Sequence, residues 1–79
     1  MRINGNRWSK MVEIPLTTVA RIMRKAGAKR VGQDAARAMA ELVEERALVI
    51  AGEAVKLAEH AGRRTVRDVD IRLATKKHI

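Results

Sequence analysis

The sequence predicts an all-α protein in which a short helix, a long central helix and a second short helix follow one another. Hydrophobic residues make up 47% of the 79 residues, mostly Ala, Val, Leu, Ile and Met, and Trp8 is the single aromatic residue. This composition suits packed helices better than sheets, because strands favour aromatic and β-branched side chains. In addition, apolar residues recur at helical spacing in three segments that are separated by glycine-containing loops.

The first predicted helix covers residues 18–26, where apolar residues fall at i, i+3, i+4 and i+7: Val19, Ile22, Met23 and Ala26. We expect Thr17 to cap its first free amides and Gly27 to end it in the left-handed conformation. Arg24 and Lys25 lie in its last turn, where positive charge interacts favourably with the helix dipole.

The central helix is predicted over residues 33–61, closed by Gly62, and is about 43 Å long at about 1.5 Å per residue. Its main apolar stripe, which neighbouring apolar residues widen, consists of Met39, Val43, Ile50, Ala54, Leu57 and Ala61. Two short helices of the same chain cannot cover so long an apolar surface. The third helix is predicted over residues 67–76, with acids in its first turn and lysines at its end, as the helix dipole favours.

So short a chain buries only a small core by itself, and it has no cysteine with which to form a disulfide or a thiolate zinc site. Its two histidines are too few for a metal cluster, so we expect no metal and no cofactor. Association with a second chain is the remaining way to complete the core.

Charge is segregated along the chain. Six acids and three bases lie between residues 33 and 61, whereas the flanks hold the other 14 of the 17 bases and only three acids. Two basic ends around an acidic middle face a polyanion if folding brings them together. Nucleic acid is therefore the expected partner.

Several other kinds of protein are disfavoured. No apolar run approaches the roughly 20 residues that span a bilayer, and the N-terminal residues lack the apolar stretch of a signal peptide. We therefore expect a protein of the cytoplasm, on the chromosome or nucleoid, with no membrane partner. Residues 1–13 are polar and basic, which predicts a flexible tail.

A set of short motifs is spread along the remaining chain. They are Ile14-Pro15, Arg21-Ile22, Lys25-Ala26-Gly27-Ala28, Arg30-Val31, Asp34-Ala35, Asp70-Ile71 and above all Leu57-Ala58-Glu59-His60-Ala61-Gly62-Arg63-Arg64-Thr65-Val66. Together they resemble an archaeal histone, continuously from about Val12 to Lys77. The resemblance implies that residues 14–79 form a histone-fold domain.

The resemblance further implies an intertwined handshake homodimer, in which the first loop of one chain lies beside the second loop of the other. In the family, residues matching Arg21, Arg30, Arg64 and Thr65 contact the DNA backbone, and this chain has suitable residues at all four. Lys29 stands in the first loop where the family usually has an acid, and it adds a positive charge to these DNA contacts. Because arginine holds phosphates through two hydrogen bonds and needs no base edge, we expect sequence-independent binding to double-stranded DNA.

The resemblance assigns two more groups of residues. Arg63 and Asp70 match a pair that braces the second loop against the third helix. Leu57, His60 and Asp70 match positions through which dimers meet back to back, building tetramers or longer filaments on DNA. Glu59, beside that surface, stands where a basic residue is common and bears on assembly beyond the dimer.

Other classes of function stay open at this point. The chain could be a subunit of a histone-fold transcription factor that pairs with a different chain, and it could equally be a histone that pairs with another histone. Such a heterodimer subunit would stay unfolded alone. The hypothesis of a basic amphipathic protein that binds anionic membranes is weaker, because helix packing already explains the apolar faces. An enzyme is not expected, because the chain has no catalytic constellation around His60 or Thr65.

Overall fold

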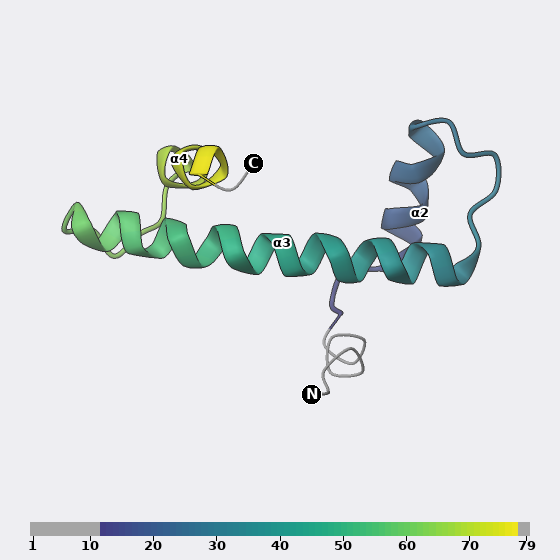
Figure 1. Ribbon diagram of the computed structural model, residues 1–79, viewed down its shortest axis with the longest axis horizontal. Coiled ribbons are helices and arrows are strands. Elements are labelled where there is room, and N and C mark those ends of the chain that lie inside the picture. Colours follow the sequence, from purple (N-terminus) through teal and green to yellow (C-terminus); the bar gives the residue numbers. More distant parts are fainter. Residues whose placement is uncertain (1–11, 78–79) are drawn as a thin grey trace. The chain divides into compact units, whose positions relative to one another are not determined.

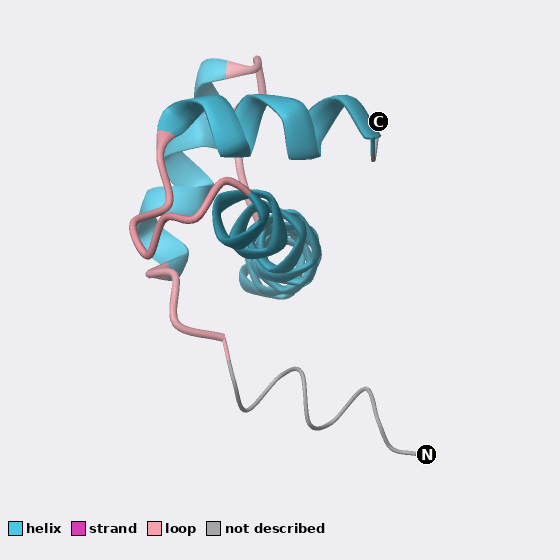
Figure 2. Ribbon diagram, turned by 90° about the vertical axis from the view of Figure 1, so that its left-hand side faces the viewer, coloured by secondary structure: helices cyan, strands magenta, loops and turns pink. Residues whose placement is uncertain are grey.

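The computed structural model describes residues 12–77, which contain three helices: α2 (Leu16–Lys25), α3 (Gln33–His60) and α4 (Asp68–Lys77) (Figure 1). Figure 2 shows only helices and loops in this range, with no strand. The predicted all-α class and the short, long, short order are confirmed. The predicted tail with Trp8, apart from its last two residues, lies outside the described residues. None of these helices is long and apolar enough to span a bilayer.

α2 begins two residues earlier than predicted because Pro15, not Thr17, stands at its N-cap. The Pro15 carbonyl accepts hydrogen bonds from the N–H groups of Thr18 (3.1 Å) and Val19 (3.3 Å), and no side chain caps the helix. The prediction that Thr17 is the cap is therefore wrong. Proline replaces it because its ring fixes φ, here −59°, and leaves no N–H of its own to satisfy.

α2 and α3 both end at a glycine in the left-handed region, with φ of 118° at Gly27 and 74° at Gly62. The N–H of the residue after each glycine donates to a carbonyl five residues earlier, at 3.1 Å after Gly27 and 2.9 Å after Gly62. This is the Schellman arrangement, which disfavours a side chain at the glycine. The two predicted helix stops are confirmed.

The chain forms two compact parts, one up to Glu45 and one from Arg46 on, and α3 contributes to both. In the first part α2 packs on the first half of α3, and the buried residues are Val19, Ala36 and Ala40. In the second part α4 packs on the second half of α3, and the buried residues are Ala54, Ala58, Asp70 and Ala74. Alanine lets helices approach closely, but it removes little apolar surface from water.

In each of the two parts, a carboxylate of α3 binds a segment near one end of the described chain. In the first part, Glu44 Oε2 accepts the backbone N–H groups of Glu13 and, at 3.0 Å, Ile14. In the second part, Lys77 Nζ donates to Glu53 Oε2 at 3.0 Å. The segment before α2 and the end of α4 are thus each held against the central helix.

Many of the large apolar side chains are exposed outside these cores. Those at least 37% exposed are Ile22, Met39, Leu42, Val43, Leu48, Val49, Val55, Val66, Val69, Ile71 and Leu73. No residue of α3 between Ala40 and Ala54 is buried. As the sequence predicts, the chain by itself leaves the middle of its long helix without cover.

The alanine contact between α2 and α3 is tested by enlarging one methyl group. Ala40 is fully buried, so we expect Ala40→Leu to lower the free energy of unfolding by about 1–3 kcal/mol through overpacking. The matched control, Ala38→Leu on the exposed side of the same helix, is expected to change it by less than about 0.5 kcal/mol. Chemical denaturation at fixed protein concentration measures both, and equal losses would contradict the packing described.

Candidate nucleic-acid interface

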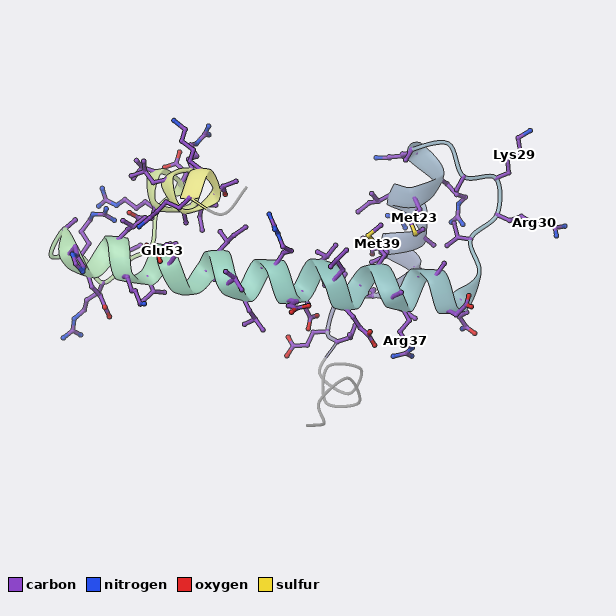
Figure 3. All side chains as sticks on the ribbon, in the orientation of Figure 1. Met23, Lys29, Arg30, Arg37, Met39 and Glu53 are labelled. Atoms are coloured by element: carbon purple, nitrogen blue, oxygen red, sulfur yellow. The ribbon has the colours of Figure 1, made fainter. Side chains whose placement is uncertain are left out.

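The first part of the chain carries a basic segment without any acid. Between Glu13 and Asp34 there are five bases and no carboxylate, and all five side chains are exposed: Arg21, Arg24, Lys25, Lys29 and Arg30. Figure 3 shows Lys29 and Arg30 extending away from the loop that joins α2 to α3. The segment therefore presents positive charge to solvent with no acid of its own to neutralise it.

The helix periodicity of α2 explains where these bases point. Val19 is buried against α3, and Arg21, two residues further along, lies on the opposite side of the helix, about 200° around its axis. Arg24 and Lys25 occupy the last turn, next to the loop, where they also offset the negative end of the helix dipole. One face of α2 is thus apolar, with Val19 packed against α3, and the other is cationic.

In the second part, the loop of residues 61–67 carries the other predicted contacts. Arg64 and Thr65 are exposed, whereas Arg63 is partly buried. Arg63 Nη1 donates a hydrogen bond of 3.1 Å to the Thr65 carbonyl, so this arginine binds the backbone of its own loop. The Arg64 and Thr65 side chains are left facing outward.

Arg63 also forms a two-bond ion pair with Asp70, with Nη1 3.0 Å from Oδ2 and Nη2 3.0 Å from Oδ1. Asp70 Oδ2 accepts a third hydrogen bond, of 2.8 Å, from the backbone N–H of Arg67 just before α4. This last contact is half of a capping box, in which the third helical residue reaches back to the N-cap. The Asp70 side chain is only 3% exposed, so its charge is satisfied almost entirely within the chain.

These contacts set the protonation of Asp70. The hydrogen bonds from Arg63 and then from the Arg67 N–H lower the pKa of Asp70 from 3.8 to about 2, against the opposing effect of burial. The same hydrogen bond raises the pKa of Arg63. The carboxylate therefore stays ionised at neutral pH, and the loop stays tied to α4.

The residues predicted from the sequence fall into two groups by location. Arg21, Lys29 and Arg30 are exposed in the first part, while Arg64 and Thr65 are exposed in the second. The three residues assigned to dimer-to-dimer contact also lie in the second part, near the end of α3 or the start of α4. Leu57 is half-buried, His60 is exposed and Asp70 is buried.

Two exposed bases, Arg24 and Lys25, belong with the first group, but from the sequence they were assigned only to the helix dipole. The signal that identifies them is the complete absence of acids between residues 13 and 34.

Comparison with known proteins gives a consistent result. Residues 12–75 match the family described as histone-like transcription factor (CBF/NF-Y) and archaeal histone. The chain is 50% identical over 66 residues to one of the subunits of archaeal histone HAN1 from Thermococcus zilligii, covering 84% of this chain and 98% of that protein. It is 47% identical over 64 residues to probable archaeal histone 3 of Methanocaldococcus jannaschii, covering 81% of this chain and 96% of that protein.

The ion pair makes a prediction about stability and pH. A carboxylate with a depressed pKa stabilises the fold fully above its unfolded pKa of 3.8, and this contribution is lost as the pH falls through about 2. We expect Asp70→Asn to lower the melting temperature at pH 7, and we expect its gap from the wild type to shrink between about pH 4 and pH 2.

Thermal unfolding followed by circular dichroism at fixed protein concentration measures this gap. The control is Asp68→Asn, because Asp68 pairs with Arg72 at 3.8 Å on the surface, where its side chain is 81% exposed. Such pairs contribute little, so this variant should follow the wild type at every pH. A gap for Asp70→Asn that does not depend on pH would count against the assignment.

Proposed function

Since the chain belongs to the family of histone-like transcription factors (CBF/NF-Y) and archaeal histones, we propose that it is a chromosomal protein that binds and compacts double-stranded DNA as a histone-fold dimer. The observation that carries the proposal is the acid-free basic segment from α2 into the following loop, with its five exposed bases. The function requires no reaction at a catalytic centre, because binding rests on charge and hydrogen bonds to phosphate.

The dimer supplies what the single chain lacks. Large apolar side chains such as Leu42, Val43 and Val49 are 43–56% exposed along the middle of α3. A second histone fold laid across this stretch removes that surface from water, at about 25 cal/mol per Å² of apolar area. Two-fold pairing through the same face on both chains is the common solution for a small protein. We propose the intertwined handshake arrangement for it.

In that dimer, the first loop of one chain lies beside the second loop of the other. Arg21, Lys29 and Arg30 then join Arg64 and Thr65 of the second chain in a single basic track. Arginine forks and lysine ammonium groups bind phosphate oxygens, and the Thr65 hydroxyl and loop amides add hydrogen bonds. Because none of these contacts reads a base edge, affinity is governed by counterion release, with a bias toward DNA that bends easily.

The Arg63–Asp70 pair supports this binding indirectly. By fixing residues 61–67 before DNA arrives, it reduces the conformational entropy that Arg64 and Thr65 lose on binding. We assign Arg63 and Asp70 as a structural brace, the histone-fold domain to residues 14–79, and a basic tail to residues 1–13.

Assembly beyond the dimer is the finer part of the proposal. We propose that two dimers meet through Leu57, His60 and Asp70 in a tetramer or a longer filament on DNA. The acid Glu59 is exposed beside this surface and weakens attraction between two dimers if a second acid faces it.

A second candidate is a protein that pairs with a different histone-fold chain, either another histone or part of a transcription factor. It is favoured by one observation: the relative from Thermococcus zilligii is named as one subunit of a histone. The two candidates differ in the behaviour of the isolated chain. A homodimer folds alone and binds DNA, whereas an obligate heterodimer subunit stays unfolded until its partner is added.

The DNA contacts are tested by removing one arginine from each loop. We expect Arg30→Ala and Arg64→Ala to weaken binding equally on unrelated DNA sequences and to reduce the slope of log affinity against log salt by about one unit per lost phosphate contact. Fluorescence anisotropy titrations over a series of salt concentrations measure this slope. Lys56→Ala, which removes an exposed base from the acidic stretch of α3, is the control and should leave the slope unchanged. A loss confined to one DNA sequence would overturn the proposal.

The tetramer surface is tested separately by His60→Glu. A charge at this position is expected to keep dimers from meeting, so micrococcal nuclease should protect shorter DNA fragments while the dimer still folds and binds DNA. Ala38→Glu places the same charge on an exposed site at the far end of α3 and should leave the fragment lengths of the wild type. Unchanged protection by His60→Glu would exclude this surface from assembly.

A further inference from the structure

We propose that Glu44 anchors the basic N-terminal segment, residues 1–11, as a further DNA-binding element beside α2. The inference rests on the proposed function, because it adds a second site for the same double-stranded DNA. Residues 1–11 lie outside the stretch of 12–75 that matches the family, so none of the DNA contacts assigned above falls on them.

Glu44 holds the chain immediately before α2. Its Oε2 accepts the backbone N–H of Glu13 and, at 3.0 Å, that of Ile14. Hydrogen bonds to a carboxylate are stronger than those to a neutral acceptor. Exposure alternates here as in an extended chain, because Val12 and Ile14 are half-buried whereas Glu13 and Pro15 are exposed. Residues 12–15 are thus the fixed root to which the basic segment is joined.

The root lies next to α2 on one stripe of α3. Ala36, Ala40 and Glu44 are four residues apart, so they lie on the same face of that helix. α2 packs on the two buried alanines, and the root meets Glu44 one turn further along. Arg21, a proposed phosphate contact, follows the start of α2 by five residues, or about 8 Å along the helix axis. DNA held by Arg21 therefore passes close to the root.

The composition of residues 1–11 suits this position. The segment has three bases, Arg2, Arg7 and Lys10, and no acid, and it holds Trp8, the single aromatic residue of the chain. Arginine and lysine neutralise phosphates, and large apolar side chains insert between the base steps of duplex DNA. At about 3.3 Å per residue, the segment reaches at most about 36 Å from its root, which is enough to follow DNA into an adjacent groove.

Anchoring increases what these bases contribute. A segment tied close to its target is at a high effective concentration there, and a root that is already ordered loses less conformational entropy on binding. The competing acids of the same chain include Glu13 in the root and Glu45 next to Glu44, both exposed. Duplex DNA carries one negative charge per about 1.7 Å of its axis, so we expect the bases to bind DNA in preference to these acids.

Trp8 supplies a direct test, because no other aromatic residue contributes to the fluorescence of the chain. The full chain is titrated with double-stranded DNA of mixed sequence, and acrylamide quenching of Trp8 is compared with and without DNA. We expect the quenching constant to fall by at least about twofold when DNA covers the indole. Unchanged quenching, where the anisotropy of labelled DNA shows that it is bound, overturns the inference and leaves the proposed function standing.

The three bases are tested together in the full chain. We expect the combined variant Arg2→Ala, Arg7→Ala and Lys10→Ala to reduce the slope of log affinity against log salt by about one unit per lost phosphate contact, up to about three per chain. The matched control changes three neutral residues of the same segment and should keep the wild-type slope: Asn4→Ala, Asn6→Ala and Ser9→Ala. If the bases pair with acids of their own chain instead, the slope of the combined variant is unchanged or steeper, and either result overturns the inference.

The anchor is tested with Glu44→Ala and Glu44→Asp, which remove or shorten the side chain that accepts the two N–H groups. We expect whichever of them folds to lose at least about half of the shielding of Trp8 by DNA. Glu45→Ala is the control, because it removes the same charge from the adjacent exposed position and should keep the shielding. Glu44→Gln retains an amide oxygen as acceptor and should keep most of it.

Equal shielding of Trp8 in the Glu44 and Glu45 variants overturns the role of Glu44 as an anchor, even where DNA affinity falls. A wild-type chain that folds but leaves DNA unbound overturns the proposed function itself.

Discussion

The absence of own-chain cover along the middle of α3 is the constraint on which the rest of the structure depends. Each short helix hides only alanine methyl groups of the long helix, together with Val19 on one side and Asp70 on the other. Many of the larger apolar side chains remain exposed to solvent. In the proposed dimer, the concentration of the partner therefore enters the stability of the fold directly.

Electrostatics is arranged by position. Two carboxylates of the central helix, Glu44 and Glu53, hold other segments of the chain, while α2 and the loop that follows it keep their cations exposed. The one buried acid, among residues 12–77, is Asp70, and its pairing with Arg63 shapes a loop instead of neutralising the outward arginine, Arg64. The attraction for a polyanion thus depends more on the positions of the charges than on the net charge.

The sequence predicted most where the cause is local. The glycine stops at Gly27 and Gly62 follow from backbone conformation alone, whereas the start of α2 was missed because a proline cap lacks the side-chain signal of Thr17. The Glu44 contact joins residues about 30 positions apart, so no local pattern reveals it.

The alanine cores have a consequence for how related chains can diverge. A contact made of methyl groups at van der Waals distance accepts neither a larger side chain nor, without loss of the close approach, a rearranged helix pair. Mutational drift is therefore confined to the outward faces. A genome that encodes several such chains can keep one scaffold and vary the central face of its long helix, so that the repertoire of assemblies grows combinatorially from a fixed architecture.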